Sequence, residues 1–75
     1  MAKQKTDFET LDISTRPKRR KAVALVIMAL VRICSAEEAY LDRIPDNLQG
    51  GDACAAAEDS IDFISEAISN LVDAY

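Results

Sequence analysis

Hydrophobic residues recur at intervals of three and four through residues 23–44. The row consists of Val23, Ile27, Leu30, Cys34, Glu37, Leu41 and Ile44, all apolar except Glu37. Side chains at this spacing lie on one side of an α-helix. Ser14 and Thr15 precede the pattern as candidate caps, and Pro17 is tolerated in a first helical turn. We therefore expect a helix over residues 16–44.

A second and more regular row follows in residues 52–75. Its positions alternate steps of three and four: Cys54, Ala57, Ile61, Ile64, Ile68, Leu71 and Tyr75. The acidic residues of this segment lie off the row, which is the heptad pattern of a helix packed along one seam. Asp52 is a favourable N-cap. The pattern predicts a helix over residues 52–75.

The connection between the two helices is short and begins with proline. Pro45 disfavours helical geometry at the residue before it and has no N–H to donate. Residues 45–51 contain both glycines of the chain, and seven residues are enough to join antiparallel neighbours. The expected fold class is therefore all-α, with residues 16–75 forming a two-helix antiparallel hairpin.

The first helix carries more apolar surface than one hairpin can cover. Leu25, Val26, Met28 and Val31 lie outside its row, and a helix that is apolar on several sides needs several neighbours. We expect a homodimer that forms a four-helix bundle; the alternative is a different protein that supplies the missing helices. The residues expected in these interfaces are Val23, Leu25, Val26, Ile27, Leu30, Ile33, Leu41, Ile61, Phe63, Ile64, Ile68 and Leu71.

Charge is distributed unevenly along the 75 residues. Residues 1–21 carry a net charge of +4 and residues 22–75 a net charge of −8. Cations at a helix N-terminus oppose the helix dipole. In an antiparallel hairpin this end lies beside Asp73 and the Tyr75 carboxylate, so an internal partner there is one expectation. The alternative is contact with nucleic acid or an acidic protein. Both concern the basic segment, which comprises Arg16, Lys18, Arg19, Arg20 and Lys21.

Residues 1–15 show no sustained periodicity, and we expect a mobile N-terminal arm there. The basic segment and the apolar residues 22–31 together resemble a secretion signal, but Arg32 interrupts the apolar run and acidic residues precede it. Ten apolar residues are also far fewer than the roughly 20 needed to cross a bilayer. The expected location is the cytoplasm, without membrane association.

The chain offers little for catalysis. Histidine is absent, which removes the commonest general base and metal ligand. Glu38, Asp42, Glu58 and Asp62 are spaced differently from the acidic motifs of magnesium-dependent helical pyrophosphatases, so we interpret them as solvated. A hairpin offsets Cys34 and Cys54 by roughly 12 Å, beyond the ~7 Å reach of a disulfide. We expect no enzyme, no metal and no cofactor.

Residues 36–75 contain a distinctive turn motif between the two expected helices. The motif I-P-x-N-L-Q occurs as Ile44, Pro45, Asp46, Asn47, Leu48 and Gln49, followed by an Ala- and Asp-rich helix. This part of the chain resembles short uncharacterised helical-hairpin proteins of Gram-positive bacteria and their mobile elements. The resemblance implies a hairpin and supplies no function. We predict a non-catalytic protein-interaction module, an adaptor, regulator or inhibitor; the alternative is a nucleic-acid-binding accessory protein that uses the basic segment.

Overall fold

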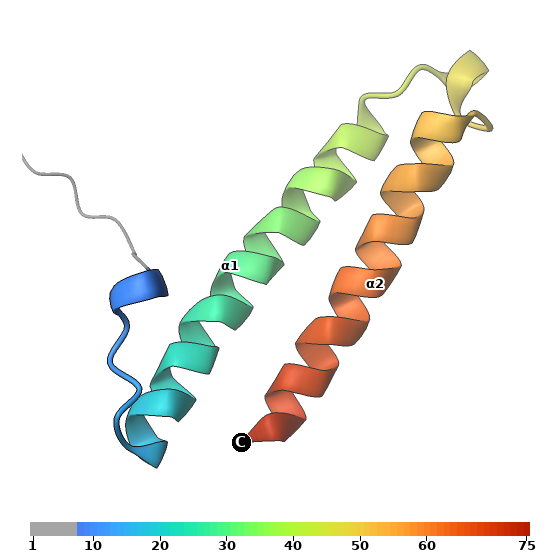
Figure 1. Cartoon of the computed structure of the whole chain (residues 1–75). Helices are drawn as coiled ribbons and strands as arrows, with labels where there is room; N and C mark the ends of the chain where they lie inside the picture. Colours follow the sequence, from blue (N-terminus) through green and yellow to red (C-terminus); the bar gives the residue numbers. More distant parts are fainter. Residues whose placement is uncertain (1–7) are drawn as a thin grey trace, which may run out of the picture.

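Two long antiparallel helices form the body of the protein. The computed structural model describes residues 8–75, and this range contains helices and no strands. Helix α1 spans Arg16–Asp42 and helix α2 spans Asp52–Ala74, and they pack side by side (Figure 1). Two short 3₁₀ turns, η1 (Phe8–Thr10) and η2 (Asp46–Leu48), precede α1 and α2. The all-α antiparallel hairpin is thus confirmed.

Helix α1 begins where the sequence predicted. Thr15 has extended backbone geometry, and its side-chain oxygen accepts a hydrogen bond from the backbone N–H of Lys18 at 3.3 Å. This satisfies one of the amide groups that a first turn leaves unpaired. Pro17 occupies that first turn, where a missing N–H costs nothing.

Both helix boundaries at the turn differ slightly from the prediction. Helix α1 ends at Asp42 rather than residue 44, because the backbone tightens ahead of Pro45: the N–H groups of Arg43 and Ile44 donate to the carbonyls three residues earlier, each at 3.1 Å. Gly51, not Asp52, is the N-cap of α2. Asp52 instead lies in the first turn, where its charge favours the helix dipole.

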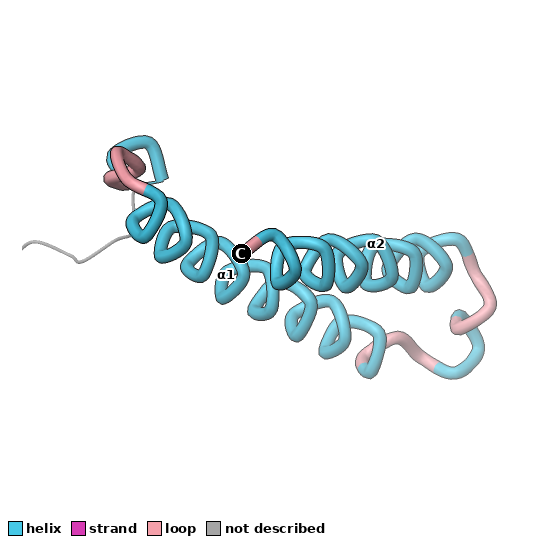
Figure 2. The backbone as a smooth tube through the Cα atoms, turned by 90° about the horizontal axis from the view of Figure 1, so that it is seen from below, coloured by secondary structure: helices cyan, strands magenta, loops and turns pink. Residues whose placement is uncertain are grey.

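The seam between the helices is narrow and lined by the two predicted rows. Among the described residues only Ala22, Cys54 and Ala57 are buried, and the larger side chains of both rows are half-buried except Tyr75, which is exposed. The helix axes are inclined to each other (Figure 2), and the smallest extent of the chain is 14 Å. That is close to the diameter of one helix. The hairpin is therefore a single layer, with both of its faces open.

The segment before α1 folds back along the first turns of that helix. Residues 8–15 lie on the side of α1 away from α2 (Figure 1), and Leu11 lines one open depression together with Ala22 and Leu25. Of the arm expected at residues 1–15, the structure places residues 8–15 beside α1; residues 1–7 lie outside the described range. Ala22, at the floor of α1 beside this depression, is buried although it is not in the predicted row.

Candidate interaction site

One face of the hairpin is free of charge along most of its length. On each helix it is formed by four positions that follow one another at intervals of four, three and four residues. Its members are Ala29, Ile33, Ala36 and Tyr40 on α1, and Ala56, Ser60, Phe63 and Ala67 on α2. Three large side chains stand open here: Phe63 is 72% exposed, Ile33 47% and Tyr40 42%. We name this surface the uncharged face.

In an antiparallel pair, the two rows share one side of the molecule because each lies on the same flank of its seam row, and two concavities lie along this side. A shallow depression on α1 is lined by Ala29, Arg32, Ile33 and Ala36. Nearer the turn, a cavity of about 300 Å³ is lined by Tyr40 of α1, Ala53 of α2, and Arg43, Ile44, Pro45 and Leu48 of the connection. Ala53 is three residues before Ala56 and so lies on the same side of α2. Small residues in both rows leave room for another helix to approach.

The two long edges of the uncharged face carry opposite charges. Arg32 and Arg43 border it on α1, because they line the same two concavities as Ile33 and Tyr40. On α2, Asp59 and Glu66 lie four residues before and three residues after Phe63, which makes them its neighbours on the helix surface. Helix α2 contains no basic residue. One edge is therefore basic and the other acidic.

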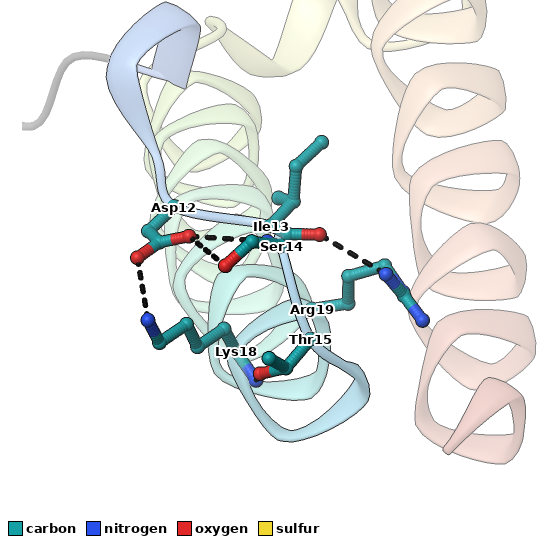
Figure 3. A network of polar contacts seen from close by, with 6 residues as sticks. All are labelled: Asp12, Ile13, Ser14, Thr15, Lys18 and Arg19. Atoms are coloured by element: carbon teal, nitrogen blue, oxygen red, sulfur yellow. Dashed lines mark hydrogen bonds and ion pairs between the residues drawn. The ribbon is translucent and has the colours of Figure 1, made fainter.

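Three of the five side chains in the basic segment have partners within the chain. The Arg16 guanidinium lies over the Tyr75 ring, 4.8 Å from its centre. Lys18 Nζ is 2.8 Å from Asp12 Oδ2, and Arg19 donates to the Ile13 carbonyl at 3.1 Å (Figure 3).

These contacts only partly match the expected anchoring near the end of α2. Tyr75 serves as a partner through its ring rather than its carboxylate, and Lys18–Asp12 is the one ion pair among the side chains described in residues 10–75, so none there involves Asp73. Residues 8–15 fold back beside α1 and bring Asp12 to Lys18, so the partner of Lys18 is not a side chain of α2. The carboxylate that anchors the basic segment therefore comes from the arm.

The contacts of Asp12 make the position of the arm dependent on pH. Lys18 first, and then the Ser14 hydroxyl and N–H, hold the pKa of Asp12 below its ordinary 3.8. A lowered folded-state pKa stabilises the fold above the unfolded value, and this contribution is lost as the pH falls through the lowered pKa. We expect residues 11–15 to leave the first turns of α1 in that acidic window, as measured by NMR.

A variant separates this effect from general acid unfolding. In K18Q the pKa of Asp12 should rise toward 3.8 while the helical circular dichroism at neutral pH is unchanged, because the pair is exposed. The two hydrogen bonds from Ser14 remain in this variant and should keep the pKa of Asp12 somewhat below 3.8. An Asp12 carboxyl that titrates identically in both proteins would contradict the ion pair.

The two thiols lie far apart along the seam. Cys34 Sγ is 3.9 Å from Ser65 Oγ, which is eleven residues beyond Cys54 on α2, or about 16 Å along a helix. Both cysteines are free, and the separation is larger than the one expected from the sequence. Cys54 Sγ donates to Glu58 Oε2 at 3.8 Å, and burial, followed by the Glu58 charge, raises the pKa of the Cys54 thiol. A thiol with a raised pKa is a poor nucleophile at neutral pH.

The structure assigns the predicted interface residues to different surroundings. Most are half-buried between α1 and α2 or beside that seam: Val23, Val26, Ile27, Leu30, Leu41, Ile61, Ile64, Ile68 and Leu71. Leu25 is half-buried beside Leu11 of the arm. Only Ile33 and Phe63 remain on an open surface, where both belong to the uncharged face. The alanines of this face were missed because small residues give a weak hydrophobic signal, although their spacing of three and four is visible.

The acidic residues considered for metal binding do not converge. Within residues 8–75, no three acidic or thiol side chains are grouped so that they could hold a metal ion. No helix in that range combines the length and the apolar character needed to cross a membrane. No family model, curated protein or solved structure matches the chain. The resemblance of residues 36–75 to mobile-element hairpins stays a prediction.

Proposed function

We propose that this protein is a non-catalytic protein-interaction module that works as a homodimer, with two hairpins combined into a four-helix bundle. The observation that supports this proposal is the size of the core. Three small residues are the only buried ones among residues 8–75, while ten large hydrophobic side chains are exposed. A helical layer with so little buried surface is stabilised by a second layer.

The surface that such a bundle leaves outside is strongly acidic. Glu58, Asp62 and Asp73 are exposed on α2 away from the uncharged face, and a dimer presents two copies of this helix. An acidic module of this kind acts as an adaptor, regulator or inhibitor by occupying a basic site on another protein. The absence of histidine from the sequence and the dispersed carboxylates support a role without chemistry of its own.

The dimer is tested by mass and helicity at several concentrations. At micromolar concentration, light scattering should give twice the chain mass of 8.2 kDa. On dilution, the helical circular dichroism should fall together with the mass, because the monomer lacks a core of its own. A particle of 8.2 kDa that remains fully helical throughout the series would overturn the proposal.

The nucleic-acid alternative is supported by two side chains of the basic segment. Arg20 and Lys21 are exposed and make no ion pair with the side chains described in residues 10–75, whereas Lys18 pairs with Asp12. Two exposed cations on each chain would give a weak, salt-sensitive attraction to phosphates. The burial observation favours the interaction module, and nucleic-acid binding stays a prediction.

A further inference from the structure

A second copy can cover the uncharged face in two symmetric ways. If the two-fold axis runs parallel to the helices, α1 of one copy lies on α2 of the other. If the axis runs across the helices, α1 lies on α1 and α2 on α2. Both arrangements bury the same apolar residues of the face, so hydrophobic burial does not choose between them.

The charges on the two edges of the uncharged face favour one of these two arrangements. With the axis parallel to the helices, the edge with Arg32 and Arg43 lies beside the edge with Asp59 and Glu66 of the second copy, on both sides of the bundle. With the axis across the helices, arginine faces arginine and carboxylate faces carboxylate. Charges that flank a helix interface favour the complementary partner and disfavour the like-charged one. The parallel axis is therefore favoured.

The heights of these charges along the hairpin also agree. The contact of Cys34 with Ser65 shows which residues of α1 and α2 are level. Arg32 is therefore level with residue 67, one residue or about 1.5 Å from Glu66, and a rotation about an axis parallel to the helices keeps heights unchanged. Arg43 is level with residue 56, about 4.5 Å from Asp59. Both separations are within the reach of an arginine side chain.

We propose that the homodimer forms on the uncharged face with its two-fold axis parallel to the helices, so that Arg32 pairs with Glu66 of the second copy and Arg43 with Asp59. This inference rests on the proposed function and specifies its partner and geometry. Neither Arg32 nor Glu66 makes an ion pair inside the described part of its own chain. Both are exposed there and available to the second copy.

Charge reversal tests the pairing. In an R32E dimer, the new carboxylate at position 32 faces Glu66 of the second copy on both sides of the bundle. In an E66R dimer, the new cation at position 66 faces Arg32 of the second copy in the same way. Each variant alone should dimerise roughly tenfold more weakly at low salt, since exposed pairs contribute about 0.2–1 kcal/mol each and repulsion replaces them. An equimolar mixture of R32E and E66R should form heterodimers of wild-type affinity, because both sides are then complementary.

Sedimentation of the two single variants, the mixture and the wild type measures these affinities, with circular dichroism as the folding check. R20E is the matched control, because Arg20 is an exposed arginine of α1 outside both edges; its dimer should keep wild-type affinity. A wild type that dimerises while R32E binds equally well or more tightly, or a mixture without heterodimers, would overturn the parallel axis alone. A monomeric wild type would overturn the proposed function itself.

Discussion

Replacing Ile33 by aspartate is expected to convert the protein from dimer to monomer at micromolar concentration. Ile33 is 47% exposed on the hairpin and lies within the uncharged face, so a second copy would bury it. A carboxylate buried without a partner costs several kcal/mol. The change occurs twice in a symmetric dimer. We expect dimerisation to weaken at least about a hundredfold, as measured by sedimentation equilibrium.

Met28→Asp is the matched control for that experiment. Met28 is the more exposed residue of the two, at 62%, and the same helix presents it away from the uncharged face. If exposed apolar area alone drove association, M28D would weaken the dimer as much as I33D. We expect its affinity to change little. Equal losses in both variants would show that the uncharged face is not the contact surface.

Replacing Ala57 by glutamate is expected to separate the two helices. Ala57 is the most buried residue of the described chain, at 4% exposed, and its small side chain lets α1 and α2 approach closely near the turn. Glutamate there adds both bulk and an unpaired charge to the seam. We expect the free energy of unfolding to fall by about 3–5 kcal/mol. For a small helical protein that is most of its stability, so thermal melts should show an unfolded or molten chain.

Ala55→Glu separates the effect of the seam from that of the added charge. Ala55 is exposed and lies in the same turn of α2 as Ala57. The two substitutions therefore add the same side chain to the same acidic helix. A55E should change the free energy of unfolding by no more than about 0.5 kcal/mol. Comparable melting temperatures for A57E and A55E would mean that α1 and α2 do not pack through Ala57.

The hairpin itself was predictable because its signals are local. The steps of three and four in both rows, Thr15 before Pro17, and Pro45 between the rows each act within about one helical turn. The errors were also local and small. Helix α1 ends two residues early because residues near a proline leave helical geometry before it, and Gly51 took the capping position expected for Asp52.

The uncharged face was only partly predictable. Ile33 and Phe63 were expected in an interface because they are large and apolar, whereas Ala29, Ala36 and Ala56 gave no signal by size. Their importance depends on the relative rotation of two antiparallel helices, which puts one flank of each row on the same side. Periodicity within one helix does not specify that rotation.

The sequence by itself determined an all-α antiparallel hairpin, its turn and its acidic second helix, because periodicity and capping depend on neighbours in the chain. Only the tertiary structure decided the register that sets the separation of the two thiols, that the arm lies beside α1, that Asp12 rather than Asp73 pairs with Lys18, and which apolar side chains remain open. The physical reason is that these contacts depend on how separate segments meet in space, and a packing that buries little surface is weakly encoded in the order of residues.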